Sequence, residues 1–148
     1  MNILVYGYGN PARQDDALGV LLAERLQGEF GDEVELDSNY QLNAEDSLLI
    51  SEKDYSVFVD ASEDAEAEPF RFKKLSPAAE IGFSTHAMDP SSILGLCHEL
   101  YAKKPDVYLL EIKGYEWGFK EGLSVKAAAN LEKATAFLKE KITEQISG

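Results

Sequence analysis

Three side chains far apart in this 148-residue chain have the chemistry of a metal site: Asp16, Asp60 and His86. Asp16 follows a glycine-containing loop, Asp60 follows a short apolar stretch, and His86 lies a few residues before a helix-start signal. Two carboxylates and one imidazole suit a first-row cation such as nickel or zinc, and three protein ligands leave positions open for substrate or water. These residue types therefore predict metal chemistry, if the fold brings the three side chains together.

The segments around these residues alternate between strand patterns and helix patterns. Short apolar, β-branched and aromatic runs predict strands, and leucines or alanines at helical spacing predict helices. This alternation is typical of an α/β fold, a three-layer α/β/α sandwich with a mainly parallel central sheet of about five strands. The length fits a single domain over residues 1–148. We expect strands over residues 3–6, 34–36, 55–59, 70–75 and 107–112, with 70–75 at an edge, and helices from residue 17, over about 43–50, over 90–101 and from residue 124.

A parallel sheet would bring the candidate residues to one edge. The glycine loop and Asp60 both come directly after predicted strands, and the carboxyl ends of parallel strands form the edge at which open α/β sheets bind ligands. Asp16 can turn back over that edge, and His86 lies in the loop before a predicted helix. The sequence thus predicts that two carboxylates and an imidazole converge there.

The loop Gly7-Tyr8-Gly9-Asn10 supplies the candidate cofactor-binding residues, which are Gly7, Gly9 and Asn10. A Gly-x-Gly after a strand can also hold a nucleotide phosphate on its backbone amides. However, Ala12 stands where the dinucleotide fingerprint has its third glycine. Nucleotide binding is therefore the weaker interpretation of this loop.

Each candidate also has a purely structural interpretation. Asp15 and Asp16 together are typical of a helix start, where a carboxylate caps the first amides. Asp60 could serve only as a hydrogen-bond acceptor for its own loop, and a lone histidine such as His86 often has only packing or solvent contacts. Asp15 is the reserve ligand if Asp16 is only a cap. The joint placement of the candidates at one edge favours the functional interpretation.

The composition argues against several other classes of protein. With 14 basic and 27 acidic residues the formal charge is 14 − 27 = −13, which opposes binding to nucleic acids and anionic membranes. The single cysteine, Cys97, falls on an apolar helix stripe, and no Gly-x-Ser-x-Gly nucleophile motif occurs. The first residues lack the cationic start of a signal peptide, and no apolar run is long enough for a bilayer. We therefore expect a cytoplasmic protein with a buried core thiol.

Three motifs, in order, resemble those of the nickel-iron hydrogenase maturation endopeptidases. Gly7-Tyr8-Gly9-Asn10 followed by Asp16-Ala17-Leu18-Gly19 is similar to the family's G-x-G-N and D/E-x-x-G elements. Val57-Phe58-Val59-Asp60-Ala61 resembles its second acidic motif, and Ser84-Thr85-His86 resembles its histidine motif. Gly114-Tyr115 and Gly122-Leu123-Ser124 resemble the segment before its last helix. The resemblance therefore extends over most of the chain.

The resemblance implies an α/β/α endopeptidase that removes the carboxyl-terminal extension of the hydrogenase large-subunit precursor after nickel insertion. It implies that Asp16, Asp60 and His86 recognise the nickel and are both the catalytic and the metal-binding residues. The nickel arrives with the precursor, and other divalent ions can occupy such a site. The resemblance also explains the lack of a serine or cysteine nucleophile, because the mechanism is metal-dependent. We expect a monomer whose partner is this precursor, with no nucleic acid or membrane partner.

Two departures from the family pattern are visible. Asp16 stands where many members have glutamate, so the carboxylate has to lie closer to the metal. Asp37-Ser38-Asn39-Tyr40 stands where many members have D-G-G-T, which leaves the target hydrogenase open. Two competing hypotheses also stay open: a non-proteolytic nucleotide- or metal-binding module, and an inactive assembly checkpoint with the same fold.

Overall fold

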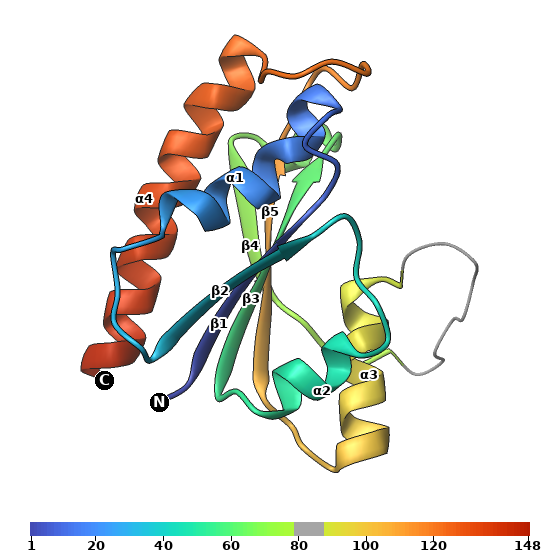
Figure 1. The fold of residues 1–148 in the computed structure, drawn as a ribbon, viewed down its shortest axis with the longest axis vertical. Helices are drawn as coiled ribbons and strands as arrows, with labels where there is room; N and C mark the ends of the chain where they lie inside the picture. Colours follow the sequence, from blue (N-terminus) through green and yellow to red (C-terminus); the bar gives the residue numbers. More distant parts are fainter. Residues whose placement is uncertain (79–87) are drawn as a thin grey trace.

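A twisted sheet forms the centre of the molecule (Figure 1). The computed structural model describes residues 1–78 and 88–148, and in these residues five strands pair in the order β2-β1-β3-β5-β4. Four strands are parallel, and β4 pairs antiparallel with β5 at one edge. The predicted mainly parallel sheet and its edge strand are confirmed. The strands are β1 (Ile3–Tyr8), β2 (Val34–Asn39), β3 (Tyr55–Ser62), β4 (Phe70–Lys74) and β5 (Asp106–Lys113).

Helices cover both faces of this sheet, as predicted (Figure 1). On one face, α1 and α4 bury a core that includes Leu22, Val57 and Leu131, and on the other α2 and α3 bury a core around Phe58 and Ile93. Two 3-10 helices, η1 (Gln14–Ala17) and η2 (Ala65–Ala67), lie in the loops. No helix of the described residues is both long enough and apolar enough to cross a membrane. The helices are α1 (Leu18–Arg25), α2 (Asp46–Ser51), α3 (Pro90–Tyr101) and α4 (Val125–Ser147).

The two long helices begin at side-chain caps. Asp89 caps α3 by accepting a 2.8 Å hydrogen bond from the Ser92 amide, and Pro90 occupies the first turn, where no amide hydrogen is needed. Ser124 caps α4 by accepting from the Ala127 amide at 3.3 Å. The Cys97 thiol of α3 is fully buried. So is the apolar stripe of α4, which consists of Ala127, Leu131, Ala134, Leu138 and Ile142. Burial raises the pKa of that thiol, as expected of a core cysteine rather than a nucleophile.

Strands β1 and β3 are longer than the sequence suggested. Their apolar runs end at Tyr6 and Val59, yet β1 continues to Tyr8 and β3 to Ser62. The predicted strand over residues 3–6 stops before Gly7, but Gly7 pairs with both neighbouring strands, opposite Ser38 and Val59. Because pairing with two strands fixes the backbone of Gly7, the lack of a side chain does not end β1 there.

Candidate functional site

Glycines let the start of α1 lie directly on the sheet edge. A Cβ atom on Gly7 would clash with the carbonyl oxygen of Gly19, and a Cβ on Gly19 would clash with that of Val59. Gly9 has φ +140 and faces the carbonyl oxygen of Asp16 just as closely. The G-x-G and D-x-x-G spacings thus allow backbone-to-backbone contact that brings Asp16 over the ends of β1 and β3.

The amides of this loop are already used within the protein. The Gly9 amide donates to the Asn39 carbonyl oxygen at 3.1 Å, and the Asn10 amide donates to Asp16 Oδ2 at 2.7 Å. A phosphate cradle needs such amides pointing at the ligand. In this structure the Gly9 and Asn10 amides are therefore not available to a nucleotide phosphate, which argues against nucleotide binding. Gly7, Gly9 and Asn10 have a structural role in positioning Asp16, and cofactor binding by these three residues stays a prediction.

Asp16 is half-buried in η1, with one carboxylate oxygen fixed by the Asn10 amide. Asn10 is itself fixed, because its Oδ1 accepts from the Ala12 amide at 2.9 Å. Within the described residues Asp16 Oδ1 accepts no hydrogen bond, and neither aspartate of η1 caps a helix. The capping interpretation of Asp15 and Asp16 is wrong, since both carboxylates bond to segments outside their own helix.

Asp60 lies near the carboxyl end of β3 and is half-buried. Burial is the main cause that raises the pKa of Asp60 to about 7, and the charges of Asp16 and Glu111 raise it further. Hydrogen bonding from the Tyr8 hydroxyl and the Ala61 amide partly offsets this shift. Burial and the charge of Asp60 also raise the pKa of Tyr8 far above its usual value, so Tyr8 stays a neutral donor. Asp16 and Asp60, hereafter the acidic pair, are therefore near enough for the charge of one to influence the pKa of the other.

Asp15 has a different role from its neighbour. It is fully buried, and its carboxylate accepts from the amides of Tyr115, Glu116 and Ser124 at 2.7, 2.9 and 2.8 Å. The Ser124 hydroxyl donates a fourth bond at 2.7 Å. Burial alone would raise the pKa of Asp15, but these hydrogen bonds outweigh it and hold the pKa below its ordinary value. Because its lone pairs are committed to this Asp15 network, Asp15 is not available as a reserve metal ligand.

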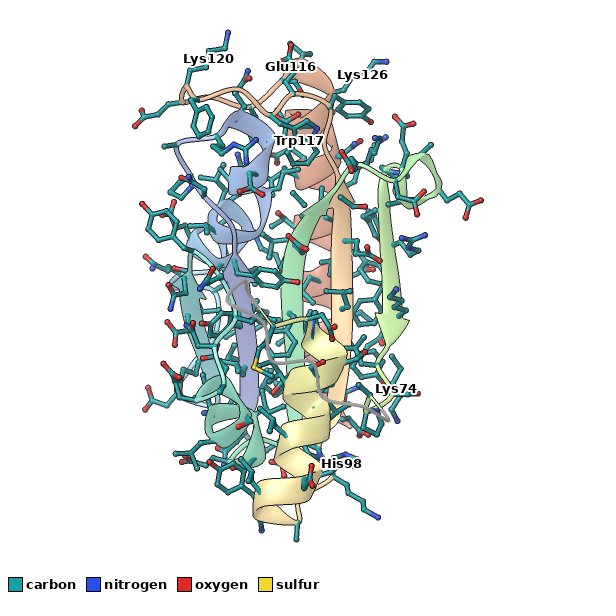
Figure 2. All side chains as sticks on the ribbon, turned by 90° about the vertical axis from the view of Figure 1, so that its right-hand side faces the viewer. Lys74, His98, Glu116, Trp117, Lys120 and Lys126 are labelled. Atoms are coloured by element: carbon teal, nitrogen blue, oxygen red, sulfur yellow. The ribbon has the colours of Figure 1, made fainter. Side chains whose placement is uncertain are left out.

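Two more residues before Asp15 hold the same segment, residues 114–124. Gln14 has φ +45, and its side chain accepts from the Gly118 amide at 2.8 Å while its own amide donates to the Lys120 carbonyl at 2.9 Å. Arg13 donates from Nη2 to the Trp117 carbonyl oxygen at 2.9 Å. Figure 2 shows Trp117 and Lys120 at one end of the molecule, opposite His98. No local sequence pattern predicts these contacts, because the partners lie about a hundred positions apart.

Several solved structures have the same fold as this chain. No family model and no curated protein matches the sequence. Among solved structures, the hydrogenase maturation protease HycI from Thermococcus kodakarensis is 26% identical, with a TM-score of 0.73 over 94% of this chain and 90% of that chain. The hydrogenase maturating endopeptidase HybD from E. coli is 22% identical, with a TM-score of 0.76 over 98% and 94%. The chain shares its fold with named hydrogenase maturation proteases. The resemblance found in the motifs is thus confirmed.

Of the three site residues that the endopeptidase resemblance implies, two lie within electrostatic range of each other. Asp16 and Asp60 form the acidic pair, whereas His86 lies outside the described residues. Within residues 1–78 and 88–148, no group of three histidine, cysteine, aspartate or glutamate side chains could hold a metal ion. A three-ligand site therefore needs His86 or an atom of the substrate to complete it.

Two pockets lie beside this endopeptidase-like site. One, of about 410 Å³, is lined by Arg13, Ala61, Glu63 and Trp117, and we call it the Glu63 pocket. The other, of about 280 Å³, lies between Gly9 and the exposed ring of Tyr40, where the sequence departs from the family's D-G-G-T segment. Ala61 follows Asp60 directly, and Gly9 touches the backbone of Asp16. Both hollows are thus lined by residues of the loops and strand ends that carry Asp16 and Asp60, and each is large enough for a side chain.

Proposed function

We propose that this chain is an endopeptidase that removes the carboxyl-terminal extension from a nickel-iron hydrogenase large-subunit precursor once nickel has been inserted. One observation carries the proposal: Asp16, in η1, and Asp60, near the carboxyl end of β3, interact electrostatically in a fold shared with named hydrogenase maturation proteases. Fold alone does not define an activity, so the acidic pair supplies the chemical part of the argument.

The nickel ion is part of the substrate in this proposal. Asp16, Asp60 and His86 recognise the nickel that the precursor already holds, and this contact places the scissile bond next to the site. Carboxylate and imidazole ligands suit nickel, and its charge favours the ionised form of both carboxylates. When bound there, nickel can polarise a carbonyl group or activate a water molecule.

The residues of the chain prepare this recognition. The Asn10 amide holds one oxygen of Asp16, which leaves the second oxygen for the metal. Since the pKa of Asp60 is about 7, its carboxyl can release a proton when nickel binds and can accept one from water at neutral pH. The Tyr8 hydroxyl supports the charged form of Asp60 by donating a hydrogen bond to it. Together these contacts favour a metal-bearing substrate over an apolar one.

Mass spectrometry of the precursor tests the proposal. Nickel-loaded and nickel-free large-subunit precursors are incubated with the chain, and a short carboxyl-terminal peptide should be lost only from the loaded form. Asp16→Asn, Asp60→Asn and His86→Ala should each abolish cleavage while the fold is retained.

A matched control is available at the second histidine. His98 lies on α3 at the opposite end of the molecule (Figure 2), so His98→Ala should cleave at the rate of the unmodified chain. An unchanged rate in His86→Ala would refute the role of that residue. No cleavage of any loaded precursor by the folded chain would favour the inactive assembly checkpoint instead.

A further inference from the structure

The pocket beside Tyr40, hereafter the Tyr40 pocket, lies against Asp16. A Cβ atom on Gly9, which lines the pocket, would lie only 3.5 Å from Cγ of Asp16. The pocket has a volume of about 280 Å³, enough for one side chain. A substrate held by Asp16 is therefore within reach of it. Its lining consists of Gly9, Pro11, Val20, Ser38, Asn39 and Tyr40.

Small residues create this hollow between α1 and the end of β2. Ser38 pairs in register with Gly7, whose Cα faces α1, so neither strand has a large side chain there. Val20 of α1 forms one wall, and the ring of Tyr40, which is 66% exposed, forms another. The exposed ring next to the hollow leaves apolar surface that a ligand can cover.

The described residues that line the Tyr40 pocket carry no charge. The Glu63 pocket differs, because Arg13 and Glu63 give its wall both signs of charge. A charged group in the Tyr40 pocket would lose water without gaining a partner of opposite charge, whereas an apolar side chain gains from burial against Val20 and the Tyr40 ring. The lining thus selects an apolar side chain.

The outer edge of β2 indicates how such a side chain is presented. The carbonyl oxygens of Glu33 and Asn39 accept hydrogen bonds of 2.8 and 3.1 Å from amides at the two ends of β1. Because backbone groups alternate in direction along a parallel strand, those of Leu36 and Ser38 point away from β1. In the part of the chain that the structure describes, no strand pairs with β2 on that side (Figure 1). An extended peptide can therefore add to this edge.

We propose that the Tyr40 pocket binds an apolar side chain of the hydrogenase precursor, presented by an extended segment that pairs with the outer edge of β2. This inference rests on the proposed function. A residue of the added strand opposite Ser38 has its side chain on the same face of the sheet as Ser38, so it reaches the pocket beside Val20. The contact sets the register of the peptide relative to Asp16.

Binding and cleavage of the precursor test this inference. Tyr40→Ala should raise Kd for the nickel-free precursor and KM for the nickel-loaded precursor roughly three- to tenfold, with kcat changed less than about twofold, because it removes a pocket wall without altering the acidic pair. Tyr101→Ala is the control: it removes another exposed tyrosine ring, at the end of α3, and should leave both constants within about twofold.

A charge placed in the pocket gives a second test. Val20→Asp should raise Kd and KM roughly tenfold, since an apolar side chain cannot pair with the new carboxylate. Val125→Asp is the matched control, because Val125 is 88% exposed at the start of α4 and does not line the pocket. Tyr40→Ala, which removes a ring outside the core, decides alone if Val20→Asp fails to fold.

A double-mutant cycle identifies the bound side chain. Each apolar residue near the cleavage site of the precursor is replaced by alanine, and one replacement should weaken binding to the unmodified chain but cause little further loss with Tyr40→Ala. Equal Kd and KM values for Tyr40→Ala and Tyr101→Ala would overturn the pocket assignment and leave the proposed function intact. A dimer of the chain that Tyr40→Ala dissociates would assign the pocket to a second copy and also overturn it.

The inference and the proposed function fail separately. Weaker binding by Tyr40→Ala, with no cleavage by the unmodified chain, would support the pocket and refute the proposed peptidase activity. If the unmodified chain binds neither form of the precursor, both are overturned.

Discussion

Replacing Asp15 by alanine should destabilise the protein without touching the acidic pair directly. The substitution removes the acceptor of four hydrogen bonds, three of which come from backbone amides. These amides belong to residues 114–124, before the start of α4, and they cannot reach another protein acceptor unless that segment moves. An amide left without a partner costs about 1–3 kcal/mol where water cannot reach it. Glu116 is exposed, so its amide can bond to water instead. We therefore expect a loss of about 3–5 kcal/mol in the free energy of unfolding.

Urea unfolding followed by circular dichroism measures this loss. For a domain of this size it corresponds to a fall in Tm of roughly 6–20 °C. Trp117 is the only tryptophan and lies in the same segment, so its fluorescence reports whether the segment detaches before the domain unfolds. Asp32→Ala is the control, because Asp32 is exposed and should change the stability by less than about 0.5 kcal/mol.

The pH dependence gives this prediction its sharpest test. The folded pKa of Asp15 lies below its unfolded value of about 3.9, so its stabilisation is complete above that value and is lost as the pH falls through the folded pKa. The difference between the unmodified chain and Asp15→Ala should thus be full at pH 7 and narrow below about pH 4. A difference under about 1 kcal/mol, or one that does not vary with pH, would refute the role assigned to the Asp15 network.

Two further predictions concern the acidic pair and the glycine contact. Carbon-13 NMR titration should give a higher Asp60 pKa in Tyr8→Phe, because this variant removes a hydrogen-bond donor to the carboxylate. It should give a lower Asp60 pKa in Asp16→Asn, because this variant removes a neighbouring negative charge. Shifts of the Asp60 pKa in the same direction in both variants would contradict this account. Gly19→Ala should push α1 away from the end of β3, lower the stability by about 1–3 kcal/mol and abolish cleavage, whereas Gly31→Ala, with open space around its Cα, should cleave normally.

Local sequence patterns predicted the elements of this fold well. The stripe of α4 and the Asp89-Pro90 start of α3 were identified correctly because periodicity and capping depend on residues close in the chain. The lengths of β1 and β3 were underestimated, since Gly7 stays in its strand through pairing with two distant strands. Local patterns thus predicted which residues prefer helix or strand, but not the pairing between distant strands that extends β1.

The site was predicted in part for the same reason. Placing Asp16 and Asp60 at one edge followed from the order of strands and loops, and in the structure the charge of Asp16 influences the pKa of Asp60. The role of Asp15 was missed because its partners lie 100 to 109 positions away. A pair of adjacent aspartates before a helix looks like a helix cap when only neighbouring residues are considered. The sequence therefore could not distinguish Asp15, which has a structural role, from Asp16, the candidate metal ligand.

The Asp15 network also bears on when the site forms during protein synthesis. It joins the fifteenth residue to Ser124, and so the loop that holds Asp16 acquires its final support only after most of the chain has left the ribosome. A nascent chain that has produced β1 and β3 still lacks the residues that donate hydrogen bonds to the Asp15 carboxylate. Because contacts between distant positions form late, we expect the acidic pair to be ordered last, together with the docking of α4. We therefore expect incomplete chains to lack an ordered acidic pair, so that the proposed activity would begin only when the last helix has been synthesised.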